Sequence, residues 1–202
     1  MPFYGISLKL PMNFENTITM RDKFIILSFL LWFIPFFSRI TMNISYDSLP
    51  VLNDMSNSPL SILYTALKNS DSDEAFLLVF KNNIKSCLIN VCGGVSLGVC
   101  TIVNLAYNGF ATSDMFVVSY QSGFSLSDIL KTTLPHSFEL IGFWLSGAMG
   151  LMIAYRLLLF MRGREDISKD FLKQMCIMAF IVFVTTLCAA YVETHISVNM
   201  LK

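Results

Sequence analysis

Residues 24–44 read FIILSFLLWFIPFFSRITMNI. Spanning about 30 Å of hydrocarbon as a helix takes roughly 20 mostly apolar residues, because each backbone N–H and C=O must be paired inside the segment. This run meets that requirement, with Pro35 expected to kink it and Arg39 expected to reach the headgroups near its end. It is therefore predicted to be a transmembrane helix.

Three further segments pass the same test, at residues 86–107, 137–161 and 172–192. The whole chain is 54% hydrophobic and 14% charged, with a mean hydropathy of +0.62. That is more apolar surface than one soluble core of 202 residues can hide, so the bilayer must act as part of the solvent. The predicted fold class is all-α, a polytopic transmembrane helical bundle with four strong spans.

Two stretches between the strong spans are less apolar. Within residues 45–83, the runs SPLSILYTALKNS (58–70) and DEAFLLVFKNN (73–83) have the pattern of short amphipathic helices lying in the interface. Residues 108–134 contain an apolar run of only about ten residues. They favour a weak, re-entrant or interfacial segment over a fifth crossing, which would fall near residues 109–124.

These segments divide the chain into five parts. Residues 1–23 form an N-terminal polar segment, 24–44 the first transmembrane helix, and 45–83 a polar and amphipathic connection. Residues 84–196 form the core helical membrane domain, and 197–202 a tail.

Lysine and arginine positions bear on the orientation of the chain, because cytoplasmic loops of membrane proteins are enriched in them. The densest basic cluster lies between the last two spans, which predicts that this loop is cytoplasmic. With four crossings the N-terminus would then be outside, in conflict with the basic residues before the first span; a fifth crossing would remove the conflict. The two groups are Arg162, Arg164, Lys169 and Lys173 in the loop, and Lys9, Arg21 and Lys23 before the first span.

Small residues recur at intervals of four in two of the spans. Such stripes let helix backbones approach closely in lipid, where no hydrophobic force drives helices together. We expect them to pack on another helix, either of this chain or of a partner. They are Gly94 and Gly98 in one span, and Gly142, Ser146, Gly150 and Ala154 in the next.

Polar groups gather near one membrane face if the last two spans form an antiparallel hairpin. His136 and Glu139 begin one span, Glu193 and His195 end the other, and Asn104 and Asn108 end the second span, from which they could join the cluster. Structural capping at a crowded helix end is the leading interpretation, since Glu139 lies near a helix N-terminus. A proton-linked pair and a metal site remain open. No cofactor or bound metal is expected.

Composition and motifs exclude several classes of protein. The formal net charge is zero and the pI is near 6.7, so nucleic acid is not an expected partner. No phosphate-cradling GxxxxGK[ST] and no GxSxG occurs. We therefore expect a non-enzymatic protein, and any energy it uses must come from another subunit.

Three stretches carry a family resemblance. They are FKNNIKSCLINVCGGVSLGVCTIVNLAYNGF (80–110), LPHSFELIGFWLSGAMGLMIAYRLL (134–158) and LCAAYVETHI (187–196). Together they resemble the stage II sporulation protein M family, in which an Asn-Asn pair precedes a glycine-rich span, Asn-Gly ends it, Pro-His-Gly-x-x-Glu opens a later span and Glu closes the last. The matching positions here are Asn82, Asn83, Asn108, Gly109, Pro135, His136, Glu139 and Glu193, and Ser137 stands where the family usually has Gly.

The resemblance implies a multi-pass component of the bacterial inner (cytoplasmic) membrane without known catalysis. Some family members look like permease-type subunits associated with ATP-binding cassette ATPases, while the sporulation member scaffolds peptidoglycan-degrading partners. We expect a permease-like subunit that works with a cytoplasmic ATPase as a homo- or hetero-oligomer. The alternatives are a scaffold for extracytoplasmic cell-wall enzymes, and an intramembrane His/Glu metal or proton-linked site. The position of residues 45–83 distinguishes the first two, because coupling to an ATPase needs them inside and a scaffold needs them outside.

Overall fold

The computed structural model describes residues 19–42, 72–121, 123, 125–133, 137–164 and 168–197, and these ranges contain helices and turns without a strand. The long helices are α1 (Met20–Thr41), α3 (Ser72–Cys92), α4 (Val99–Gln121), α6 (Ser137–Met161) and α7 (Lys169–Val192). A short helix α5 (Leu126–Thr133) follows α4, and a π-helical turn η5 (Glu193–Ser197) follows α7. The all-α fold class predicted from the sequence is confirmed.

Four of these helices, α1, α3, α6 and α7, are long and apolar enough to cross a membrane. Helix α6 lies at the centre of the bundle and contacts α1, α3, α4 and α7. Its buried residues include Phe143, Met149 and Met152, which form the core with residues such as Trp32 of α1 and Val182 of α7. The outer surfaces remain apolar, as expected for helices that face lipid: Ile34, Val103 and Phe180, among others, are exposed.

The second predicted span is wrong as one continuous helix over residues 86–107. Helix α3 ends at Cys92, the chain turns through residues 93–98, and α4 begins at Val99. The turn needs two left-handed residues, Leu97 with φ of 55° and Gly98 with φ of 87°. The amide of Gly98 donates to the carbonyl of Gly93 at 3.0 Å, and the Ser96 hydroxyl accepts from the amide of Cys100 at 3.2 Å. These glycines therefore reverse the chain instead of lying along one helix.

This reversal also corrects the neighbouring predictions. The run at 73–83 is the first half of α3 and not a separate interfacial helix, and residues 108–121 continue α4 and are not a re-entrant segment. The predicted connection 45–83 therefore includes the beginning of α3. The run at 58–70 lies outside the described residues. Helix α1 begins and ends three or four residues earlier than the predicted span at 24–44.

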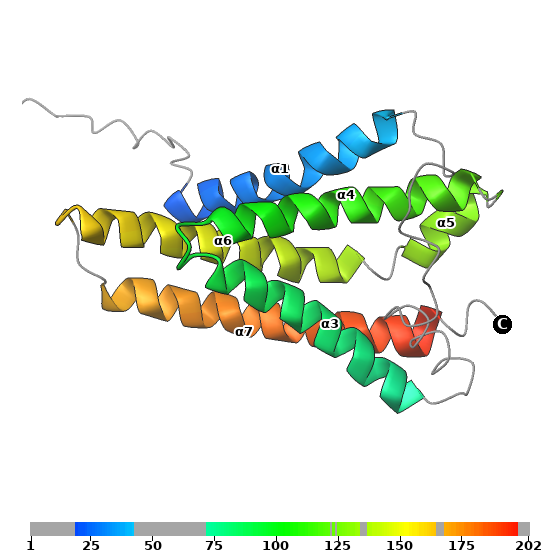
Figure 1. Ribbon diagram of the computed structural model, residues 1–202. Helices are drawn as coiled ribbons and strands as arrows, with labels where there is room; N and C mark the ends of the chain where they lie inside the picture. Colours follow the sequence, from blue (N-terminus) through cyan, green and yellow to red (C-terminus); the bar gives the residue numbers. More distant parts are fainter. Residues whose placement is uncertain are drawn as a thin grey trace, which may run out of the picture.

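Successive long helices run in opposite directions, as Figure 1 shows. The beginning of α1, the turn between α3 and α4, and the loop between α6 and α7 lie toward one end of the bundle, which we call the basic end. The ends of α1, α4 and α7 and the beginnings of α3 and α6 lie toward the opposite end. Arginines and lysines gather at the basic end: Arg21, Lys23, Arg156, Arg162, Arg164, Lys169 and Lys173.

Helix α4 has the length of the membrane spans, because its 23 residues extend about 34 Å at 1.5 Å per residue. The contact between α4 and α1 is more extensive than that between any other two elements of the described residues. At their closest approach, a Cβ on Gly109 would collide with the backbone carbonyl of Trp32. Five antiparallel crossings would place the beginning of α1 and the α6–α7 loop on the same side, and this agrees with their shared basic charge.

We expect labelling from the two sides of the membrane to verify this arrangement. In a cysteine-free background, Leu126→Cys on α5 should react with a membrane-impermeant maleimide added outside intact cells, whereas Lys23→Cys at the beginning of α1 should react only after permeabilisation. If α4 did not cross, the two sites would lie on the same side. Both side chains are exposed, so accessibility to water does not separate them. Reaction of both sites from the same side would contradict five crossings.

Candidate functional site

A buried amide lies where three helices meet. Asn90 of α3 is fully buried, and its Nδ2 donates to the Ser146 hydroxyl at 3.0 Å and to the carbonyl of Phe143 at 3.3 Å, both on α6. Its Oδ1 accepts from Nδ2 of Asn104 on α4 at 2.8 Å, and its backbone carbonyl accepts from the Thr101 hydroxyl at 2.7 Å. One side chain thereby joins α3 to α4 and to α6.

The hydrogen bonds continue along α4. Asn104 also donates to the carbonyl of Ser86 at 3.1 Å, and Asn108 donates to the carbonyl and to Oδ1 of Asn104 at 2.8 and 3.1 Å. The Thr112 hydroxyl donates to the carbonyl of Asn108 at 2.7 Å. We call Asn90, Thr101, Asn104, Asn108 and Ser146 the amide network.

Glycines let the helices approach closely enough for the amide network to form. A Cβ on Gly150 would collide with the carbonyl of Asn90 and would lie 2.6 Å from the hydroxyl of Thr101. A Cβ on Gly94 would lie 2.6 Å from the carbonyl of Gly150. Backbone atoms cannot move aside as a flexible side chain can. A larger residue at Gly94 or Gly150 would therefore push the helices apart and break hydrogen bonds of the amide network.

The predicted packing residues all lie against helices of this same chain. Gly98 faces Ala154, whose Cβ would be 3.3 Å from an added methyl, and Gly142 faces Thr185 and Thr186 of α7. Ser146 is buried and belongs to the amide network. The small residues of α6 therefore pack against three elements: α3, the turn that follows α3, and α7.

An ion pair between a buried arginine and a half-buried aspartate joins α1 to α4, nearer the end opposite the basic end. Arg39 is 1% exposed and does not reach outward to the headgroups as predicted. Its Nε and Nη2 bind Oδ1 of Asp114 at 2.7 and 2.6 Å, and its guanidinium lies 5.9 Å from the ring centroid of Phe110. The pairing explains how a charge is accommodated near the end of an apolar helix, since an unpaired charge there is costly.

Two residues of the predicted polar cluster, Asn104 and Asn108, lie in the amide network instead. Asn104 and Asn108 are the sixth and tenth residues of α4 and bond to the amide network, because the turn at residues 93–98 moves them away from the end of a span. Glu139 and Glu193 are half-buried at the beginning of α6 and the end of α7. The ring of His195 stacks on Tyr191 with centroids 4.4 Å apart, and His136 lies outside the described residues.

Within the described ranges, no three His, Cys, Asp or Glu side chains are grouped so that they could hold a metal ion. The amide network itself consists of amides and hydroxyls, which donate and accept hydrogen bonds without titrating near neutral pH. Four buried polar atoms have no hydrogen-bond partner among the described residues: Trp32 Nε1, Asn83 Nδ2, Ser113 Oγ and Trp144 Nε1. The amide network, in contrast, is hydrogen-bonded across α3, α4 and α6 and can hold these helices together. The sequence alone does not single out its central residue, Asn90.

The long apolar helices, their opposed directions and the polar groups paired between them define a multi-pass α-helical membrane protein. The family model of stage II sporulation protein M matches residues 24–198, and the chain belongs to that family. An uncharacterized protein of Methanocaldococcus jannaschii is 27% identical over 129 residues, which cover 60% of this chain and 70% of that protein. No solved structure matches the chain significantly.

Asn90→Leu is expected to destabilise the folded protein strongly. The substitution removes the donor to Ser146 and leaves the amide of Asn104 without its 2.8 Å acceptor inside the bundle. The loss should be about 1–3 kcal/mol, because a buried polar group loses its partner. Thermal unfolding in detergent is the measurement. Val103→Leu, on an exposed face of α4, is the control and should unfold like the natural chain.

Gly150→Ala should lower the unfolding temperature more than Gly142→Ala. Both add one methyl to α6, but at residue 150 it meets the backbone carbonyl of Asn90, whereas at residue 142 it lies 2.7 Å from the Thr185 hydroxyl, which can rotate. Equal effects of the two substitutions would contradict the close contact between α3 and α6.

Proposed function

We propose that this chain is a non-enzymatic membrane subunit that holds extracytoplasmic partner proteins at the membrane. Enzymes that remodel the cell wall are the class of partner that the family resemblance suggests. The observation that carries the proposal is the position of the connection between α1 and α3: α1 ends and α3 begins at the end opposite the basic end.

The sidedness follows from charge. Lysines and arginines are retained on the cytoplasmic side of membrane proteins, and here they gather around the beginning of α1 and the α6–α7 loop. If that end is cytoplasmic, the connection over residues 43–71 starts and finishes on the extracytoplasmic side. Helix α5 and the π-helical turn η5 lie toward the same side.

The connection between α1 and α3 is the longest stretch of chain between consecutive described helices. Its ends, Met42 and Ser72, are separated by 29 residues of chain, whereas the α3–α4 reversal takes six residues and the α6–α7 connection seven. A subunit that recruits partners from outside is expected to carry its longest connection between helices there. A subunit coupled to an ATPase is expected to carry it inside.

The interior of the bundle supports a holding role over a conducting one. Asn90, Thr101 and Ser146 are fully buried and bonded to one another across α3, α4 and α6. A path for a substrate would have to run between copies of the chain or break these contacts. Permease activity driven by a cytoplasmic ATPase, the function favoured by the sequence, therefore becomes the competing outcome of the test.

Site-specific photo-crosslinking in living cells should distinguish the two functions. A crosslinking amino acid at Leu130, exposed on α5, should capture extracytoplasmic proteins, and the same amino acid at Arg162, exposed at the basic end, should not. Mass spectrometry then identifies the captured chains after purification in mild detergent. Recovery of cell-wall enzymes at residue 130 supports the proposal. A stoichiometric ATPase captured at residue 162 would replace it with the transport function.

A further inference from the structure

Two lysines lie on the outward face of α3 at membrane depth. Lys81 and Lys85 are both exposed, and their spacing of four residues places them on one side of the helix. Asn82, next to Lys81, is also exposed. We call Lys81, Asn82 and Lys85 the lysine face. Because α3 is a candidate membrane span, and an exposed charge in hydrocarbon is costly, this surface needs a partner.

Contacts before and after the lysine face fix its depth in the bundle. The ring centroid of Phe80 lies 5.8 Å from that of Phe183, which is near the middle of α7. Asn90 bonds to Ser146, which is near the middle of α6. Residues 81–89 therefore lie at the middle of the bundle and not near either of its ends.

The headgroups are out of reach of Lys85. At 1.5 Å per residue, it lies about 20 Å from the beginning of α3 and about 10 Å from its end. Helical side chains lean toward the N-terminus of their helix, which is the more distant end here, and the four methylene groups of a lysine do not extend that far. Lys85 therefore requires an acceptor at mid-depth.

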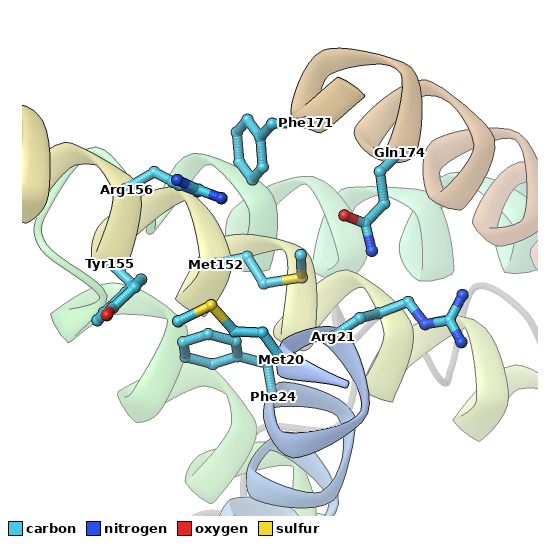
Figure 2. Close-up of a pocket in the computed structure, with 8 residues that line it drawn as sticks. All are labelled: Met20, Arg21, Phe24, Met152, Tyr155, Arg156, Phe171 and Gln174. Atoms are coloured by element: carbon cyan, nitrogen blue, oxygen red, sulfur yellow. The ribbon is translucent and has the colours of Figure 1, made fainter. Parts of the chain in front are cut away.

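Arginines elsewhere in the bundle are accommodated differently. Arg39 binds Asp114. At the basic end, around a small cavity, Figure 2 shows Arg156 beside Phe171, with its guanidinium 5.5 Å from the ring centroid, and Arg21 extending away from it. Those two arginines lie where the helices leave the hydrocarbon. By contrast, no carboxylate of the described residues lies within ion-pair distance of the lysine face.

The neighbouring helix α4 extends this polar surface. Helices α3 and α4 run in opposite directions, and Asn104 bonds to the carbonyl of Ser86, so residue 108 is level with residue 82. Asn108 is half-buried and donates from its Nδ2 to the carbonyl and Oδ1 of Asn104. Its own Oδ1 accepts no hydrogen bond from the described residues. A group that matches this surface has a carboxylate for the lysines and an N–H or O–H for Asn108.

We propose that the lysine face binds a membrane-spanning helix of a partner protein that carries Asp or Glu at mid-depth. The carboxylate pairs with Lys85, and polar side chains of the same helix bond to Asn108. In hydrocarbon such contacts hold helices together, because lipid offers no alternative partner. The inference does not rest on the proposed function, since a scaffold and a transport subunit could both bind a partner in this way.

Neither lipid nor a second copy of this chain supplies the carboxylate. Phospholipid headgroups lie at the membrane surface, and their tails carry no charge. In the described long helices, all acidic side chains lie at helix ends except Asp114, which is bound to Arg39. Charge complementarity therefore favours a different protein as the occupant.

Photo-crosslinking of the full-length chain in its native membranes tests the proposal. A crosslinking amino acid at Ile89, exposed one turn after Lys85, should capture a membrane-spanning peptide of another protein that contains Asp or Glu, identified by mass spectrometry of the joined peptides. The same amino acid at Ile34, exposed on α1, should not capture that peptide. Lys81→Gln/Lys85→Gln should lower the yield at residue 89 by roughly tenfold or more, because the partner's carboxylate is left unpaired in lipid.

Lys169→Gln/Lys173→Gln is the matched control, since it removes the same charge from exposed positions at the beginning of α7. It should keep the natural yield, and so should Lys85→Arg, which retains the charge. In detergent, Lys81→Gln/Lys85→Gln should unfold at the same temperature as the natural chain, which separates lost binding from lost folding.

Several results would overturn the proposal. They are the absence of protein capture at residue 89, a captured peptide without Asp or Glu, capture of a second copy of this chain, and an unchanged yield in Lys81→Gln/Lys85→Gln. Rapid reaction of Asn82→Cys, in an otherwise cysteine-free chain in native membranes, with a membrane-impermeant maleimide would also overturn it, because it would indicate a water-filled path for an anionic substrate. The capture at residue 130 tests the proposed function separately, so either proposal can fail alone.

Discussion

The hydrogen bonds of Asn90 are the constraint on which the arrangement of the helices depends. A polar side chain inside a bilayer must find its partners in protein, because lipid offers none. Asn90 finds them on two other helices, through Asn104 of α4 and Ser146 of α6. Those bonds require α4 to fold back beside α3, and they require α6 to come so close that Gly150 leaves no room for a methyl against the carbonyl of Asn90. The reversal at residues 93–98 and the glycine contacts thus both bring α3, α4 and α6 together around Asn90.

The sequence alone predicted the helical class and three of the long helices well. Residues 137–161 coincide with α6, and the apolar runs at 24–44 and 172–192 overlap α1 and α7 to within a few residues at each end. The reason is physical: a span through lipid requires a long uninterrupted apolar run, and such a run is directly visible. The same reasoning failed at residues 86–107, because Gly93, Gly94 and Gly98 satisfy a helix-packing spacing and a chain reversal equally well. Only the positive φ of Leu97 and Gly98 distinguishes the two.

The candidate site was harder to predict than the fold, because its residues matter through their partners. Asn90 lies in an apolar run and was not singled out, and Asn104 was assigned to a membrane face. Their separation of 14 residues is meaningful only after the chain reverses between them. Arg39 and Asp114 are 75 residues apart, so pairing could not be inferred from spacing. What the sequence did contain was the signal that unpaired polar groups in membrane spans need partners. The basic charges at Arg21 and in the α6–α7 loop agreed with a fifth crossing, but the short apolar run within residues 108–134 argued against one, so the sequence left the number of crossings undecided.

The distance between residue 86 of α3 and residue 104 of α4 tests most directly the central claim that α4 folds back beside α3. Ser86 and Asn104 lie side by side, with the Asn104 amide 3.1 Å from the carbonyl of Ser86. In one continuous helix they would be about 27 Å apart, at 1.5 Å for each of 18 residues. With cysteines at positions 86 and 104 in a cysteine-free chain, a short thiol cross-linker applied in native membranes should join the two peptides, as detected by mass spectrometry. Cysteines at 86 and at the lipid-facing position 103 should join far less. Absence of the 86–104 cross-link, with both thiols shown to be reactive, would contradict the folded-back pair of helices and the amide network built on it.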